Sequence, residues 1–181
     1  NYHEGDAMLP ATALGKSKVG GENFFRGKSL NHVIVRSSPL LGRGNGLRLS
    51  FLDTLRMTLD RKKRIELPNH EVHSFAHVSG LAELVTQAIE NGLRSKIFHY
   101  GGLTKLSYYE LAVRFADRFG YDKSLIVPSQ EVFQRKSLSG DSHGRGDYSL
   151  NSRQMVEALK IKPLLIEESF DLIEKQLIAS P

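Results

Sequence analysis

Residues 11–25 carry the first group of side chains whose spacing could support chemistry. The stretch reads ATALGKSKVGGENFF and has the pattern of a helix start followed by a helix. Leu14 and Lys18 are four residues apart, so on a helix they project from the same face. A lysine offers a cation with three hydrogen-bond donors, whereas a leucine can neither donate nor accept a proton. The same residues also fit an amphipathic surface helix with two lysines in its first turns.

A second group of chemically capable side chains lies in the run HEVHSFAH, where three histidines invite a metal hypothesis. They are His70, His73 and His77. The spacing is not His-Glu-x-x-His, and the preceding Pro-Asn turn argues against one long helix that would align the imidazoles. We therefore expect no metal site.

The glycine-rich segment at residues 42–46 could be taken for a dinucleotide-binding loop. It reads GRGNG and lies between an expected strand and an expected helix. The dinucleotide fingerprint needs its third glycine three places after the second, and Leu47 stands there instead. We interpret the segment as a turn.

Hydrophobic patterning places these residues on alternating strands and helices. The run at 32–38 is β-branched and bounded by polar residues, which is typical of a buried parallel strand. Ser107 and Glu110 form a capping box, and Gly120 marks the end of that helix. Ser79 and Asn151 are the expected caps of two further helices. Strands are predicted at 32–38, 65–67 and 96–102 with an edge segment at 125–128, and helices at 11–25, 47–61, 80–92, 107–119, 151–160 and 166–178. This order predicts an α/β fold.

Bulk composition narrows the functional classes. The chain has 181 residues, 40% hydrophobic residues, no cysteine and a formal net charge of +5. The lack of cysteine fits a reducing compartment, and no apolar run is long enough to span a membrane, so we expect a cytoplasmic protein. The basic residues are scattered except for the run at 61–64, so nucleic acid is an unlikely partner.

Several short motifs, taken in order, resemble one family. The spacing of Gly15, Ser17, Lys18, Gly21 and Glu22 matches the Tyr-Gly-x-Ser-Lys-x-x-Gly-Glu segment of extended short-chain dehydrogenases. Further matches follow at Arg36 and Gly42, at Phe75, His77 and Val78, and at Arg145 with Asp147. Together they resemble most closely the dTDP-4-dehydrorhamnose reductase branch.

The resemblance implies a domain organisation. It suggests part of a doubly wound, Rossmann-like parallel sheet plus a small helical substrate-binding lobe. Residues 1–41 would end the nucleotide-binding domain, and 42–181 would be mostly substrate-binding lobe, with 74–102 returning to the sheet. Residues 1–6 would match the acidic loop in mid-domain, so an N-terminal nucleotide-binding half would belong before this chain.

The resemblance also implies a function and a site. The protein would be an NAD(P)-dependent sugar-nucleotide reductase or epimerase, with NADP or NAD as cofactor, a nucleotide sugar as ligand and a homodimer as a further expectation. Lys18 would hold the cofactor ribose, Ser37 and Ser38 would line the nicotinamide, and Arg145, on a mobile loop at 137–146, would pair with the substrate diphosphate. Leu14 occupies the position of the catalytic tyrosine. The alternative is therefore a non-catalytic nucleotide-binding regulatory subunit of the same fold, as in methionine adenosyltransferase.

Overall fold

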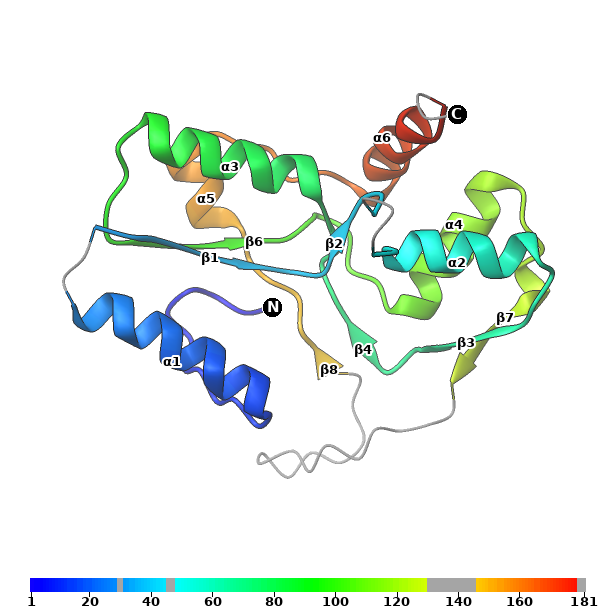
Figure 1. Ribbon diagram of the computed structural model, residues 1–181, viewed down its shortest axis with the longest axis horizontal. Coiled ribbons are helices and arrows are strands. Elements are labelled where there is room, and N and C mark those ends of the chain that lie inside the picture. The colour runs from blue at the N-terminus through cyan, green and yellow to red at the C-terminus, as the bar shows by residue number, and fades with distance from the viewer. Residues whose placement is uncertain (29–30, 45–47, 130–145, 179–181) are drawn as a thin grey trace.

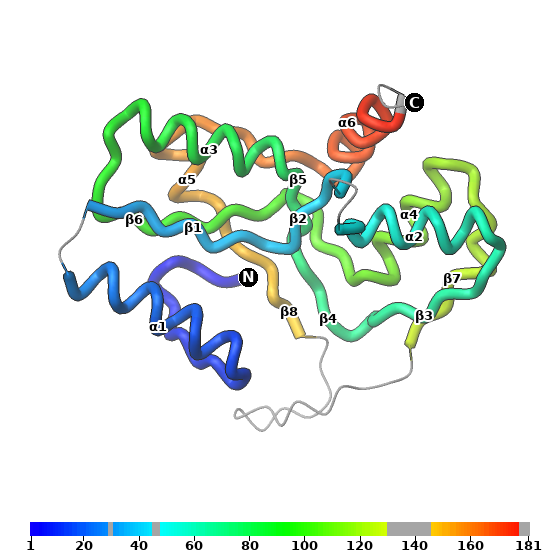
Figure 2. The backbone as a smooth tube through the Cα atoms, viewed as in Figure 1, coloured from blue at the N-terminus to red at the C-terminus, as the bar shows by residue number. Residues whose placement is uncertain are grey.

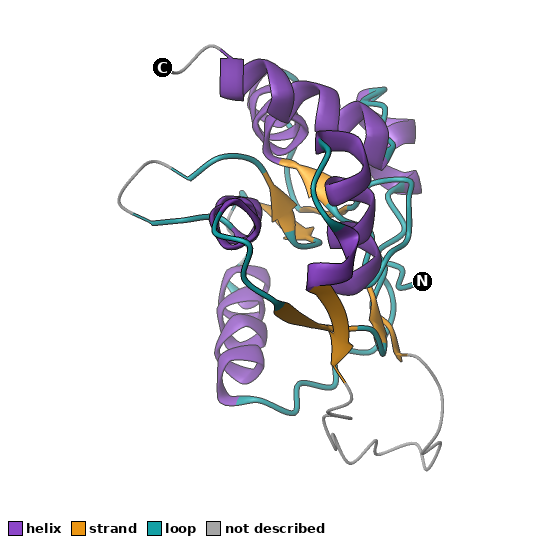
Figure 3. Cartoon of the chain, turned by 90° about the vertical axis from the view of Figure 1, so that its right-hand side faces the viewer, coloured by secondary structure: helices purple, strands orange, loops and turns teal. Residues whose placement is uncertain are grey.

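The chain folds into helices packed around short parallel strands. A computed structural model describes residues 1–28, 31–44, 48–129 and 146–178. The described strands form four two-stranded pairs, and all four are parallel. A quarter turn shows the strands in the middle with helices on both sides (Figure 3). The α/β class predicted from the sequence is therefore confirmed.

One half of the molecule is built on the pair β1 (Val33–Ser37) and β6 (Lys96–Tyr100). The helices α3 (Val78–Glu90) and α5 (Arg153–Leu159) lie along one side of this pair, and α1 (Ala13–Gly27) lies on the other (Figure 1). Buried side chains from both strand and helices make its core: Ala76, Leu84, Phe98, Tyr100, Met155, Leu159 and Ile161.

The other half contains the remaining larger helices. These are α2 (Phe51–Asp60), α4 (Tyr108–Phe119) and α6 (Ile166–Ile178), with the strand pair β3 (Ile65–Pro68) and β7 (Ile126–Ser129) after a short 3-10 helix at Lys123–Leu125. Its core includes Leu55, Leu111, Phe115, Phe170 and Ile173.

Two short strand pairs lie where the halves meet (Figure 2). The first joins β2 (Leu40–Leu41) to β5 (Ala76–His77), and the second joins β4 (Glu71–Val72) to β8 (Gly146–Asp147). In the first pair, β2 follows β1 along the chain, and β5 directly precedes α3, which lies on the β1–β6 pair. The crossing segments therefore tie the two halves together by backbone hydrogen bonds.

Helix α1 is attached in a different way from the others. Thr12 caps it by accepting a hydrogen bond from the amide of Gly15, but none of its residues is buried. It runs in the opposite direction to β1 (Figure 1), so its first turns lie at the end of the ribbon where β1 finishes. A polar contact holds it there: the guanidinium of Arg36 on β1 binds both carboxylate oxygens of Glu22, at 2.9 and 2.7 Å.

Several local predictions are confirmed. Ser107 and Glu110 form both hydrogen bonds of the capping box at the start of α4. The helix ends at Gly120, whose φ of 74° lies in the left-handed region that glycine adopts without strain. Helix α6 has the predicted bounds, and the edge segment at 125–128 is seen as β7.

Four predicted helix starts are wrong. Helix α1, predicted at 11–25, starts at Ala13 because Thr12 caps it. Helix α2 starts at Phe51 because Ser50 and Asp53 form a capping box there. Helix α3 starts at Val78, and its cap is His77, whose Nδ1 accepts from the amide of Ser79. Helix α5 starts at Arg153, with Ser152 in the capping position.

Ser152 lies in the capping position of α5, but its hydroxyl does not cap the helix because it makes other hydrogen bonds. Its hydroxyl binds the backbone of Gly101, at 2.8 Å to the amide and 3.0 Å to the carbonyl. Asn151 lies one residue before the capping position, and its Oδ1 still accepts from the amide of Arg153 at 2.9 Å.

Two predicted loops have different outcomes. The loop at 39–42 contains strand β2. The loop predicted at 137–146 lies outside the described residues except for Gly146.

Candidate functional site

A pocket of about 530 Å³ lies at the carboxyl end of β1, between the two halves. Its walls come from three separate stretches of chain: the end of β1 and the following loop, the segment after β4, and the segment after β8. The lining residues are Ser37, Ser38, Pro39, Leu40, His73, Tyr148 and Leu150. Ligands of open α/β sheets bind in the crevice outside the carboxyl ends of the strands. The pocket is therefore the candidate functional site.

Buried serines fix the floor of this pocket. The hydroxyl of Ser74 donates to the hydroxyl of Ser38 at 3.3 Å and accepts from the amide of Leu150 at 3.0 Å. The amide of Ser38 donates to the carbonyl of Tyr100 at 2.9 Å. These bonds connect the end of β1 to the other two walls, so the pocket is a connected unit and not a gap between independent loops.

His73 is held rigidly in the wall. Its backbone exchanges two hydrogen bonds with Leu106, at 2.8 and 3.0 Å. Its ring stacks on the ring of Tyr148, with centroids 5.7 Å apart and planes 21° apart, meets the ring of Tyr108 edge-on and contacts the ring of Phe75 at a tilt. Rings packed on several sides cannot rotate freely, so the imidazole is pre-positioned toward whatever fills the pocket.

Two acidic side chains, Glu71 and Asp147, act on the imidazole of His73. Nε2 of His73 is buried and lies 3.7 Å from Oε2 of Glu71, which is longer than a hydrogen bond. Burial lowers the pKa of His73, although the negative charges of Glu71 and Asp147 oppose this change. For Asp147, burial acts to raise the pKa, but hydrogen bonds from Ser149 and Lys105 outweigh it and hold the pKa well below its usual range. The imidazole is therefore neutral at pH 7, and Asp147 is ionised.

A second polar network lies under the β1–β6 ribbon. The backbone amide of His99 donates to Oε1 of Glu4 at 2.9 Å. In the ring of His99, Nδ1 lies 3.0 Å from the carbonyl oxygen of Tyr2. A carbonyl only accepts, so Nδ1 carries the proton and Nε2 accepts from Arg36 at 3.3 Å. The hydrogen bond to Glu22 raises the pKa of Arg36 despite its burial. This network anchors the first residues and α1, and it does not line the pocket.

The structure places the predicted site residues in three different ways. Ser37 and Ser38 lie together in the pocket. Leu14 and Lys18 lie on α1 with exposed side chains, 69% exposed for Leu14, and neither lines the pocket. Arg145 lies outside the described residues. In the described parts of the chain, no group of three histidine or acidic side chains is arranged to hold a metal ion.

Sequence reasoning did not find His73, Tyr148, Leu40 or Leu150 as pocket residues. His73 was considered only as a metal ligand. Nothing in the sequence shows that β4 and β8 pair in register and so bring the two rings together.

The fold and the position of the pocket define the class, and comparison with known proteins agrees. Parallel strand pairs, a pocket at the carboxyl end of β1 and helices on both sides match the fold of solved dTDP-4-dehydrorhamnose reductases. More narrowly, the chain belongs to the RmlD substrate binding domain family, whose model matches residues 1–158.

Individual relatives are distant. Spore coat polysaccharide biosynthesis protein SpsK of Bacillus subtilis is 25% identical over 162 residues, covering 90% of this chain and 53% of SpsK. Methionine adenosyltransferase 2 subunit beta of Rattus norvegicus is 25% identical over 132 residues, covering 70% and 40%. The dTDP-4-dehydrorhamnose reductase of Bacillus anthracis, solved in complex with NADP, aligns with a TM-score of 0.78 at 18% identity, covering 96% and 58%. The chain thus spans about half the length of these relatives.

Proposed function

We propose that this chain is the ligand-binding part of a sugar-nucleotide reductase- or epimerase-like protein that uses NADP or NAD. The observation that carries the proposal is the pocket at the carboxyl end of β1, in a chain of the RmlD substrate binding domain family. The sugar of a nucleotide sugar would occupy that pocket, where two serines, a histidine and a tyrosine offer hydrogen bonds to its hydroxyl groups.

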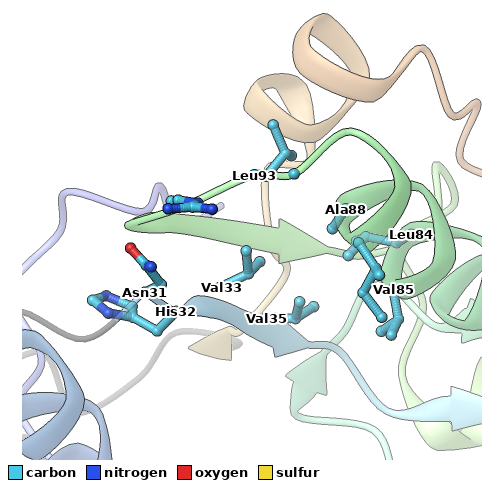
Figure 4. Close-up of a pocket in the computed structure, with 11 residues that line it drawn as sticks. Asn31, His32, Val33, Val35, Leu84, Val85, Ala88 and Leu93 are labelled. Carbon is cyan, nitrogen blue, oxygen red and sulfur yellow. The ribbon is translucent and has the colours of Figure 1, made fainter.

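The cofactor would be held by a nucleotide-binding unit that docks on β1. Within the described residues β1 pairs only with β6, so its other edge has unpaired backbone groups. A groove of about 400 Å³ lies beside it, lined by Val33 and Val35 of β1 and by Leu84, Val85 and Ala88 of α3 (Figure 4). Val85 is 45% exposed, so apolar surface is left open. A βα unit with one more parallel strand would pair with the edge and cover the groove.

This arrangement would give roles to the predicted domains and site residues. Residues 1–41 would complete the nucleotide-binding domain, and residues 42–181 would form most of the substrate-binding lobe, with 74–102 returning to the sheet. Ser37 and Ser38 already lie at the strand end where a nicotinamide would meet the sugar. Lys18 would bind the cofactor ribose, and Arg145 would pair with the diphosphate, since its planar fork matches phosphate oxygens.

A second function is supported by Leu14. A leucine at the tyrosine position of the family motif supplies no proton, and one relative is methionine adenosyltransferase 2 subunit beta. The same pocket would then bind a nucleotide without turnover, as a regulatory subunit. Consumption of NADPH in the presence of a nucleotide sugar separates the two functions.

The experiment common to both functions is ligand binding by this chain. Calorimetric titration with a dTDP-sugar should give saturable binding, and Arg145→Ala should weaken it about tenfold or more, because a charge-assisted hydrogen bond contributes about 1.5–3 kcal/mol. Arg135→Ala is the matched control and should leave the affinity unchanged. Absence of saturable binding by the wild-type chain would overturn the proposal.

A further inference from the structure

The pocket contains two side chains that can exchange a proton with a bound ligand. Of the seven lining residues, only His73 and Tyr148 have ionisable groups. The serine hydroxyls ionise far outside the working range of a protein. Leu14 has no ionisable group and is exposed on α1. If the ligand in this pocket gains or loses a proton, the structure therefore offers His73 or Tyr148 as its partner.

The surroundings favour the histidine. The Glu71 carboxylate faces His73 with one oxygen and His70 with the other, at 3.7 and 3.9 Å from the two Nε2 atoms. At 3.7 Å the carboxylate makes no hydrogen bond, but its negative charge favours the tautomer with the proton on the facing Nε2, which leaves Nδ1 as the ring nitrogen that can serve a ligand. The same carboxylate stabilises the positive charge that forms when the imidazole takes up a second proton.

The packing of the ring supports the same role. His73 is 15% exposed, and its ring contacts with Tyr148 (stacked), Tyr108 (edge-on) and Phe75 (tilted) hold the ring in one orientation. The ring therefore cannot turn away from either the carboxylate or the pocket. A residue that only filled space would need neither the carboxylate nor an opening to the pocket.

We propose that His73, oriented by Glu71, is the proton-transfer residue of this pocket and uses Nδ1 to protonate the carbonyl oxygen of a bound keto sugar. The proposal rests on the proposed function, because it takes the nucleotide sugar as the ligand. A reduced nicotinamide held by the proposed nucleotide-binding unit would supply the hydride to the carbonyl carbon. The imidazolium of His73 would donate its proton to the carbonyl oxygen, so that C=O becomes CH–OH, and the neutral imidazole would regain a proton from solvent.

This role makes ligand binding depend on pH. Burial keeps His73 neutral at pH 7, so forming the imidazolium–carbonyl hydrogen bond takes up a proton. The groups that face the ring are Glu71 from β4, Asp147 from β8, paired with Lys105, and the phenols of Tyr108 and Tyr148. His70 faces the other oxygen of Glu71, and His73 is the imidazole that lines the pocket.

The test is titration calorimetry of the chain with a dTDP-linked 4-keto sugar, in two buffers of different ionisation enthalpy. Wild type should take up close to one proton per ligand, and its affinity should tighten about tenfold for each unit that the pH falls from 7.5 to 6.5. His73→Gln should bind without proton uptake and with a flat pH profile. Glu71→Gln should reduce the uptake, and His3→Gln, an exposed histidine outside the pocket, should behave as wild type.

The outcomes distinguish this inference from the proposed function. Equal proton uptake in wild type and His73→Gln would overturn the role of His73, and loss of uptake in Tyr148→Phe alone would transfer that role to Tyr148. Absence of binding by wild type would overturn the proposed function itself. A ligand-free measurement adds an independent check: imidazole nitrogen chemical shifts should show His73 as the Nε2–H tautomer, and the Nδ1–H tautomer would contradict the orientation by Glu71.

Discussion

The attachment of α1 can be tested through one carboxylate. Glu22 and Arg36 are only 16% and 18% exposed, and their two hydrogen bonds join a helix without buried residues to β1. Removing one partner from a fully buried ion pair costs about 3–5 kcal/mol, because the other charge is left without compensation. Water reaches this pair in part, and Arg36 keeps contacts to the carbonyl of Glu4 and to His99. We therefore expect Glu22→Ala to weaken the docking of α1 by about 2–3 kcal/mol.

The assay is hydrogen exchange read by mass spectrometry. A loss of 2–3 kcal/mol raises the exchange rate of the amides in α1 by about 30- to 150-fold. Helix α4, whose inner face is buried in the other half, should be unchanged. Loss of the carboxylate should thus appear as local opening of α1 and not as unfolding of the whole chain.

The matched control is an ion pair of equal length at the surface. Arg153 and Glu157 lie 2.7 Å apart but are 79% and 60% exposed, so water screens this pair and Glu157→Ala should change the exchange of α5 very little. If Glu22→Ala changed the exchange of α1 no more than Glu157→Ala changes the exchange of α5, the helix would be held by something other than this pair, and the reasoning would be refuted.

Two further predictions concern pH and the tyrosine position. Burial lowers the pKa of His73, His77 and His99 in the folded chain. Below about pH 6.5 the unfolded chain therefore binds more protons than the folded chain. The melting temperature should be highest above that pH and fall as the pH drops toward 5. A melting temperature that rises on acidification would contradict this sign. In a protein that carries the proposed nucleotide-binding unit, Leu14→Tyr should leave the rate of NADPH consumption with a dTDP-4-keto sugar unchanged, because position 14 is exposed and lies outside the pocket. A rise of about 10²–10⁴, the size of a general-acid contribution, would show instead that position 14 faces the reacting carbonyl.

The sequence alone determined the features that depend on neighbouring residues. The capping box of Ser107 and Glu110 and the stop at Gly120 are local chemistry, because each bond joins residues a few positions apart. The strand at Val33–Ser37 follows from a β-branched run with polar ends. The ordered succession of short motifs was sufficient to predict the α/β class and the family.

Only the tertiary structure decided which residues share the pocket. Ser37, His73 and Tyr148 come from three distant parts of the chain, and the parallel pairing of β4 with β8 brings the last two into stacking contact. A one-residue change of that register would turn one ring to the opposite face, and the local sequence does not encode the register. Long-range contacts also displaced local preference. The hydroxyl of Ser152 binds the backbone of Gly101 and so caps no helix, while at α3 the cap is the buried His77 and the predicted cap, Ser79, is exposed. Caps can be predicted from sequence only where no distant backbone competes for the same hydroxyl.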